Sequence, residues 1–191
     1  MSKQVSADGY IFDFSDDIID AFVFDSPEYH DGLQSMKAVD IIAEFPQEYL
    51  YIELKKYDPD RGGIQFRCPL WGSKSGITKC CPLSKDDEKR DLASVKRIAQ
   101  DLRRKYSDTF LYRYAEDKTD KPVNYICVVE GCDSALINRL HEILKHAIPK
   151  GIVRDSWKRP IVKNIVVVNI DNWNKSDSIN RYGHCSLVEN G

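Results

Sequence analysis

The hydrophobic residues of this chain fall into separate runs, and their spacing predicts both strands and helices. Residues 36–45 and 48–57 are two short runs rich in β-branched and aromatic residues. Because a Pro-Gln dipeptide joins them, we expect an antiparallel pair of strands. Residues 123–131 and 161–171 are further apolar runs with enough β-branched residues for buried strands. The sequence therefore predicts a sheet that contains these four strands.

Three other segments carry the spacing of hydrophobic residues that is typical of helices. They are residues 15–24 with Ser15 as the expected N-cap, residues 86–106, and residues 135–148 with Asp133 or Ser134 as the cap. The elements thus follow one another as helix, two strands, helix, strand, helix and strand. This order predicts an α/β fold in which a mixed β-sheet is flanked by helices.

Two segments fall outside this pattern. Residues 58–84 are rich in glycine, proline and cysteine, and a connection of this length predicts an inserted loop or hairpin after the second strand. Residues 172–191 form a polar tail in which Trp173 is the expected anchor. The length of 191 residues fits a single domain over residues 1–191 with one substantial core.

The second strand has a helical alternative, because some of its apolar residues also lie at helical spacing. Its alternating pattern, short length and aromatic content favour the strand. The choice matters for the chemistry of the chain. In a strand, Glu53 and Lys55 point to the same face of the sheet, whereas in a helix they would lie about 200° apart.

The composition is that of a folded protein, with 42% hydrophobic and 30% charged residues. The N-terminus lacks the apolar core of a signal peptide, and no run of about 18 apolar residues predicts a membrane span, so we expect a cytoplasmic protein. Residues 1–60 hold 4 Lys and Arg against 14 Asp and Glu, whereas the rest holds 24 against 16. An acidic part suited to cations thus precedes a basic part suited to phosphates, although chance clustering would give the same pattern.

Charged residues interrupt the first pair of strands. Asp40 lies inside a run of Val and Ile, where an ionised aspartate is costly without a cation or a partner. If the strands pair, Asp40 and Glu53 come together, and two carboxylates suit a hard divalent cation such as Mg²⁺ or Mn²⁺. Lys55 can then orient an attacking water and meet the charge that develops on a phosphate. The alternative is an exposed Glu-Lys pair beside a turn aspartate.

An aspartate, a spacer and then Glu-x-Lys, found here in VDI and YIELK, resembles the motif of the PD-(D/E)XK, or restriction-endonuclease-like, nuclease superfamily. The resemblance implies a restriction-endonuclease-like fold and a Mg²⁺-dependent nuclease that hydrolyses phosphodiester bonds, with DNA as the expected nucleic acid. It implies that Asp40 and Glu53 are metal ligands, that the carbonyl of Leu54 is a third, and that Lys55 is catalytic. A proline often precedes the aspartate in this superfamily, and Val39 takes its place here.

Many members of the superfamily carry a further acidic residue on the first helix. The candidates are Asp16, Asp17 and Asp20, with Glu28 as a weaker one. Enzymes that cut both strands of a duplex often work as dimers, so a homodimer or a larger assembly stays open. Nothing in the sequence marks an interface.

The helix expected at residues 86–106 has a basic outer face. Its residues are Lys89, Arg90, Lys96, Arg97, Arg103, Arg104 and Lys105. This face is suited to contacts with a nucleic-acid backbone that give affinity without sequence specificity, and the alternative is a solvated helix surface. The loop at residues 154–160 adds Trp157, which either stacks on a base or packs on the core.

Six cysteines without a secretory signal are expected to be reduced. Cys68, Cys80 and Cys81, together with Cys185 and His184, could bind zinc or an iron–sulfur cluster, but the lack of any Cys-x-x-Cys argues against a metal site. Two rival functions remain. One is a catalytically idle module of the same fold that binds nucleic acid or protein in a defence or repair assembly. The other is an unrelated α/β domain that binds a small ligand in the insertion.

Overall fold

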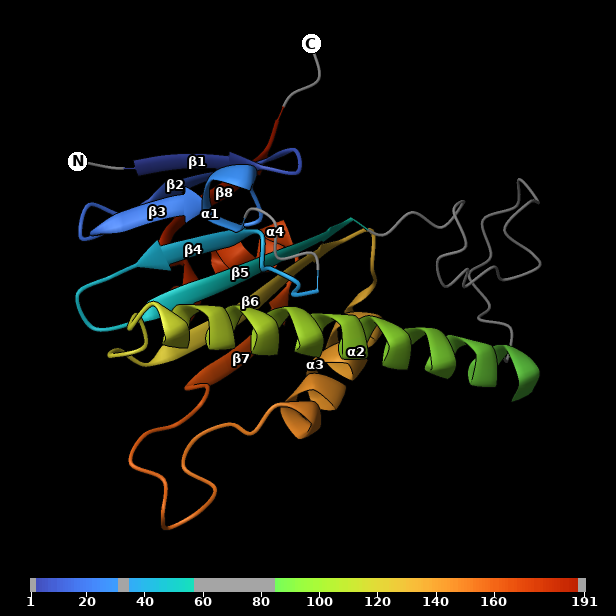
Figure 1. The fold of residues 1–191 in the computed structure, drawn as a ribbon. Helices are drawn as coiled ribbons and strands as arrows, with labels where there is room; N and C mark the ends of the chain where they lie inside the picture. Colours follow the sequence, from blue (N-terminus) through green and yellow to red (C-terminus); the bar gives the residue numbers. More distant parts are fainter. Residues whose placement is uncertain (1–2, 31–34, 57–84, 189–191) are drawn as a thin grey trace.

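The computed structural model describes residues 3–30, 35–56 and 85–188, and these contain eight strands and five helices (Figure 1). They form a small sheet of order β1-β2-β8 and a larger sheet of order β3-β4-β5-β6-β7. The small sheet comprises β1 Lys3–Ala7, β2 Tyr10–Phe14 and β8 Gly183–Leu187. The larger sheet comprises β3 Asp20–Val23, β4 Ile41–Glu44, β5 Tyr49–Lys56, β6 Val123–Glu130 and β7 Asn164–Val168. The helices are α1 Pro27–His30, α2 Lys85–Ala115, α3 Ser134–Ala147, α4 Ile170–Lys175 and α5 Asp177–Asn180.

The larger sheet is mixed. β3, β4 and β5 pair antiparallel, whereas β5, β6 and β7 pair parallel. Parallel neighbours need a crossover connection, and α2 and α3 lie in the two crossovers and cover the same face of the sheet (Figure 1). The predicted α/β class, with a mixed sheet flanked by helices, is confirmed. The restriction-endonuclease-like topology stays a prediction.

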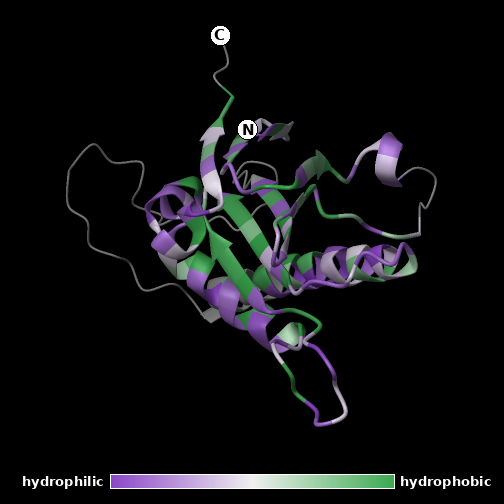
Figure 2. Ribbon diagram, turned by 90° about the vertical axis from the view of Figure 1, so that its left-hand side faces the viewer, coloured by the Kyte–Doolittle hydropathy of each residue, from purple (hydrophilic) through white to green (hydrophobic). Residues whose placement is uncertain are grey.

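Each face of the larger sheet has its own hydrophobic core, and the hydrophobic residues concentrate in its central strands (Figure 2). On the helix side, Tyr51 of β5 and Tyr125 of β6 pack around Tyr106 of α2. On the other side, Ile52 belongs to a cluster with Trp173 beneath the small sheet. Alternate residues of β5 therefore face opposite cores, as a strand requires.

The hairpin predicted from the Pro-Gln dipeptide is confirmed. β4 and β5 pair antiparallel, with Ile41 opposite Ile52 and Ala43 opposite Leu50. The first strand is shorter than predicted, because residues 36–40 precede β4 without strand structure.

Side chains of α2 take the place of a strand partner for this segment. The N–H of Lys37 donates to Asp108 Oδ2 at 2.9 Å, and the N–H of Val39 donates to the Thr109 hydroxyl at 3.0 Å. Buried backbone groups need a partner, and these residues find one on a helix rather than in the sheet.

The prediction of a helix at residues 15–24 is wrong. Residues 16 and 17 lie in a turn, and β3 follows as a strand that pairs with β4, with Ala21 opposite Ala43. The β-branched and aromatic residues of this segment suit a strand at least as well as a helix. Pairing with the sheet decides between the two.

The other two predicted helices are confirmed, with changed boundaries. α2 ends at Ala115 rather than at Tyr106, because its last turns also pack on the sheet: Arg113 is buried and its guanidinium lies 5.8 Å from the ring centroid of Phe22. α3 begins as expected, since the Asp133 side chain accepts a hydrogen bond from the N–H of Leu136 at 2.8 Å.

Residues 172–188 are more than a polar tail, because they contain most of α4, all of α5 and strand β8, which pairs with β2. Trp173 is fully buried, which confirms the predicted anchor. Gly183 has φ +128°, and a β-carbon there would lie 2.1 Å from the carbonyl oxygen of Asp13, so only glycine lets β8 approach β2 this closely. The insertion predicted at residues 58–84 lies outside the described residues.

Candidate active site

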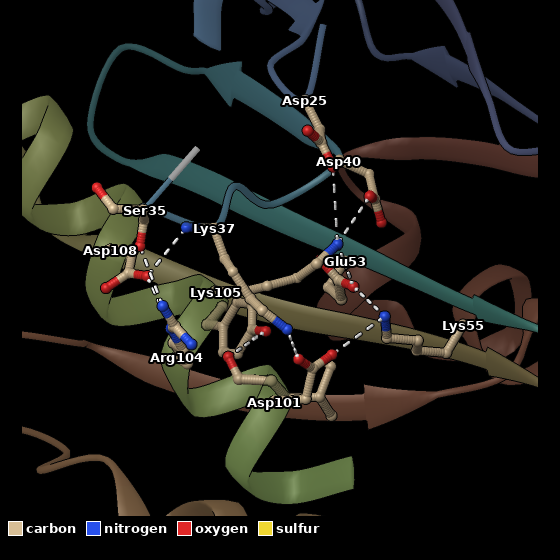
Figure 3. A network of polar contacts seen from close by, with 12 residues as sticks. Asp25, Ser35, Lys37, Asp40, Glu53, Lys55, Asp101, Arg104, Lys105 and Asp108 are labelled. Atoms are coloured by element: carbon tan, nitrogen blue, oxygen red, sulfur yellow. Dashed lines mark hydrogen bonds and ion pairs between the residues drawn. The ribbon is translucent and has the colours of Figure 1, made fainter. Parts of the chain in front are cut away.

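Asp40 and Glu53 face one another across the β4–β5 hairpin (Figure 3). Ile41 lies opposite Ile52, so Asp40, one residue earlier, comes opposite Glu53, one residue later. The N–H of Leu54 donates to Asp40 Oδ2 at 2.5 Å and holds that carboxylate against β5. Both acidic residues are buried, with exposed fractions of 6% and 0%.

Lys55 lies on the same face of β5 as Glu53, as the strand prediction required. Its ammonium is 2.9 Å from Glu53 Oε1 and 3.5 Å from Asp101 Oδ2, which α2 contributes. Asp101 also forms an ion pair with Lys37. The structure thus brings the three predicted catalytic residues together and adds an acidic residue that fixes the position of the lysine.

Lys105, one helical turn after Asp101, lies between the two carboxylates. Its ammonium is 2.8 Å from Glu53 Oε1, 3.2 Å from Asp40 Oδ1 and 3.9 Å from Asp25 Oδ2 (Figure 3). Only 13% of its side chain is exposed. The prediction that Lys105 belongs to the basic outer face of the helix is therefore wrong, because this side chain turns toward the sheet.

Glu53 is fully buried, and only one of its two carboxylate oxygens has a partner among the described residues. Its Oε1 contacts the ammonium groups of both Lys55 and Lys105, whereas Oε2 is buried without a hydrogen-bond donor among the described residues. Burial raises the pKa of Glu53 to about 7, and the charge of Asp40 adds to this against the lowering effect of the two lysines. A carboxylate in these surroundings favours an additional cation.

Burial also raises the pKa of Asp40, although Lys105 and the N–H of Leu54 oppose the shift. For Lys55, burial alone would lower the pKa, but the charge of Glu53 outweighs it and the pKa rises. Lys55 therefore stays an ammonium at neutral pH. This favours a role in orienting water and stabilising negative charge over a role as a general base.

Residues 15–24 form no helix, so Asp16, Asp17 and Asp20 do not lie on one. Asp20 forms an ion pair with Lys3 of the small sheet, and Asp16, Asp17 and Glu28 are exposed. The described residue of this segment that approaches the site is Asp25, which directly follows Phe24 after β3.

Sequence reasoning also missed the roles of Asp101 and Lys105. Both lie on the helix whose basic residues were predicted to form an outer face that meets either nucleic acid or solvent. Their spacing of four residues places them on one face of α2, and that signal is present in the sequence. Only the position of the helix on the sheet shows that this face meets β5.

The remaining basic residues of α2 that the sequence singled out are exposed. They are Lys96, Arg97, Arg103 and Arg104. Arg104 is engaged with the protein itself, since its guanidinium donates to the carbonyl of Ser35 at 3.0 Å and lies 3.4 Å from Asp108. A role of these residues in nucleic-acid binding stays a prediction. The side chains of Lys89 and Arg90 lie outside the described part of the chain.

Within residues 3–30, 35–56 and 85–188, no three His, Cys, Asp or Glu side chains gather as a metal site. Cys127 and Cys185 are buried and Cys132 is partly buried, all as free thiols, and His184 is exposed. Cys68, Cys80 and Cys81 fall outside the described residues, so the prediction on these cysteines remains open.

Comparisons with protein-family models, with curated proteins and with solved structures find no match to this chain. In the part of the chain that the structure describes, no helix has both the length and the apolar character to cross a membrane.

Proposed function

We propose that this protein is a nuclease that depends on a divalent metal ion, with Asp40 and Glu53 as the ligands of Mg²⁺ or Mn²⁺ and Lys55 assisting the attacking water. The observation that carries this proposal is the meeting of two buried carboxylates across a strand pair, with a lysine on the same face. Buried charges are costly, and an ion pair of this kind is a poor way to stabilise a fold. A catalytic role accounts for their presence in the core.

The donor atoms suit the metal. Carboxylate oxygens are the ligands that Mg²⁺ prefers, and one or two of them, together with water and substrate oxygens, are its usual set in phosphate chemistry. Glu53 Oε2 is buried without a hydrogen-bond donor among the described residues, and a bound cation would satisfy it. The carbonyl of Leu54 remains a proposed third ligand.

Each side chain has a defined task in this proposal. The N–H of Leu54 keeps Asp40 turned toward Glu53, and Asp101 keeps Lys55 beside it. Lys55 orients the water and faces the negative charge that develops on the phosphate. A bound Mg²⁺ would lower the pKa of a water molecule and neutralise charge on the scissile phosphate.

Nucleic acid, with DNA as the expected form, is the proposed substrate. The exposed Lys96, Arg97 and Arg103 of α2 lie on the same helix as the site residues Asp101 and Lys105. Contacts from such residues to the phosphate backbone would add affinity that falls with salt and does not depend on sequence. A homodimer or larger assembly in the cytoplasm stays part of this proposal.

A catalytically idle module of the same fold that binds nucleic acid or protein is the second candidate. The observation that favours it is the ammonium of Lys105, which already lies between Asp40 and Glu53 and partly neutralises them without a metal. This candidate predicts nucleic-acid or protein binding without cleavage.

Cleavage assays separate the two candidates. Plasmid, linear and single-stranded DNA and RNA are incubated with the protein in Mg²⁺, in Mn²⁺ and in EDTA. We expect the wild type to cleave only when a metal is present. Cleavage should be abolished in Asp40→Ala and in Lys55→Ala. It should be kept in Lys175→Ala, which removes an exposed lysine of α4. Thermal unfolding verifies that each variant is folded. Cleavage that survives both site substitutions would overturn the assignment, and binding without cleavage would favour the idle module.

A further inference from the structure

Lys105 places its ammonium between Asp40 and Glu53, the two proposed metal ligands. The two oxygens that it contacts are Asp40 Oδ1, just before β4, and Glu53 Oε1 of β5, and both face the same small volume. Asp40 Oδ2 is already held by the N–H of Leu54. A cation held by both Asp40 and Glu53 would therefore compete with this ammonium for their oxygens.

An ammonium and a divalent cation cannot both occupy this position. Mg²⁺ binds oxygen at about 2.0–2.1 Å, so a metal shared by these oxygens would lie inside the contact distance of the ammonium. Two cations so close would also repel each other strongly in a buried site. Metal binding that uses these two oxygens requires the ammonium of Lys105 to move away.

We infer that Lys105 is an internal competitor of the divalent metal, which holds Asp40 and Glu53 together in the metal-free protein and weakens metal binding until it is displaced. This inference rests on the proposed metal-dependent function. The four-carbon stem of lysine allows the ammonium to swing out without movement of α2. Its new partner would be an anion, and a substrate phosphate is the one that the proposed reaction supplies.

The neighbouring Lys37 offers a matched control. It carries the same charge and forms an ion pair with Asp101 of the same network. No ion pair within the described residues joins it to Asp40 or Glu53. Removing Lys37 therefore changes the charge of the region without opening the position between the two carboxylates.

The test measures Mn²⁺ binding to the full chain by isothermal titration calorimetry, without nucleic acid. The proteins are the wild type, Lys105→Met, Lys105→Gln, Lys105→Arg and Lys37→Met. We expect Lys105→Met and Lys105→Gln to bind Mn²⁺ at least about tenfold more tightly than the wild type, because a unit charge a few ångströms away is removed. Lys105→Arg, which keeps the cation, and Lys37→Met should stay within about threefold of the wild type.

Thermal unfolding supplies a second readout. Without metal, Lys105→Met and Lys105→Gln should melt below the wild type, because two buried carboxylates lose their cation. Added Mn²⁺ should raise their melting temperatures more than that of the wild type, since a ligand of the folded state stabilises it according to its affinity. If Lys105→Met does not fold, Lys105→Gln carries the comparison.

The outcomes distinguish this inference from the proposed function. Equal Mn²⁺ affinity of the wild type and of both neutral variants would overturn the competitor role and leave the metal site intact. If Lys37→Met gains as much Mn²⁺ affinity as the neutral Lys105 variants, the effect is one of long-range charge, and the competitor role of Lys105 is also overturned. If no variant binds Mn²⁺, the proposed metal site itself fails.

Discussion

Glu48 and Glu53 are two buried glutamates, one just before β5 and one within it, yet their surroundings are opposite. Glu48 accepts hydrogen bonds from Tyr182 at 2.6 Å, Asn124 at 2.8 Å and Lys163 at 3.0 Å. Burial acts to raise the pKa of Glu48, but these bonds outweigh it, and the pKa lies below its usual range. Glu53, by contrast, has contacts to two lysines at Oε1 but no hydrogen-bond donor at Oε2 among the described residues, and its pKa rises to about 7.

The difference indicates a structural role for Glu48 and a binding role for Glu53. Glu48 also forms an ion pair with Arg181 at 2.7 Å, so four side chains meet on it, from β6, from the residue before β7 and from the segment before β8. Such a network ties the C-terminal segment to the sheet. Glu53 has acidic neighbours as well as lysines and an oxygen without a donor, which suits a site that binds something further.

The largest expected difference is in activity. Glu53→Gln keeps the shape of the side chain and removes its charge, so we expect cleavage to fall by about 10³-fold or more through loss of a proposed metal ligand. Glu48→Gln should keep cleavage within about threefold once the folded fraction is equal. The measurement is the single-turnover rate on plasmid DNA in Mg²⁺. Equal rates for wild type and Glu53→Gln would remove Glu53 from the site.

The next difference is in the pH dependence of stability. The pKa of Glu53 is about 7 in the folded protein and 4.5 in the unfolded chain. As pH rises, Glu53 therefore loses its proton in the unfolded chain at a lower pH than in the folded protein. The free energy of unfolding should therefore fall by about 3 kcal/mol between pH 4.5 and 7 and then level off, and Glu53→Gln should lack this fall.

Glu48 predicts the reverse dependence. Its lowered pKa contributes stability above the usual glutamate range, and this is lost as pH falls through the folded pKa. Urea unfolding in EDTA from pH 4 to 8, with the wild type and both Gln variants, measures the two dependences. If the free energy of unfolding depends on pH in the same way in the wild type and in Glu53→Gln, the pKa of Glu53 is not raised by folding.

The smallest expected effect is the stability loss in Glu48→Ala. The substitution leaves the buried amide of Asn124 without an acceptor and separates two cations from their partner. Because Lys163 and Arg181 are about half exposed, solvent screens them, and we expect a loss of about 2 kcal/mol. Chemical denaturation at pH 7 gives the value. A loss below about 0.5 kcal/mol would contradict the view that this network holds the C-terminal segment.

The sequence alone determined the elements whose signals are local. The alternation in β5 fixed the shared face of Glu53 and Lys55, and the Pro-Gln dipeptide fixed the hairpin that brings Asp40 opposite Glu53. The cap at Asp133 and the buried Trp173 were likewise predictable, because each depends on a few neighbouring residues or on one large apolar side chain.

Only the tertiary structure decided which charged residues of α2 belong to the site. Asp101 and Lys105 look like solvent-facing residues of a charged helix until that helix is placed on the sheet. Tertiary contacts likewise decided three other features. They are the strand at residues 20–23, the approach of Asp25 to Lys105, and the pairing of β8 with β2. These contacts join residues far apart in the chain, and their energy comes from shared burial, so no local pattern of residues could specify them.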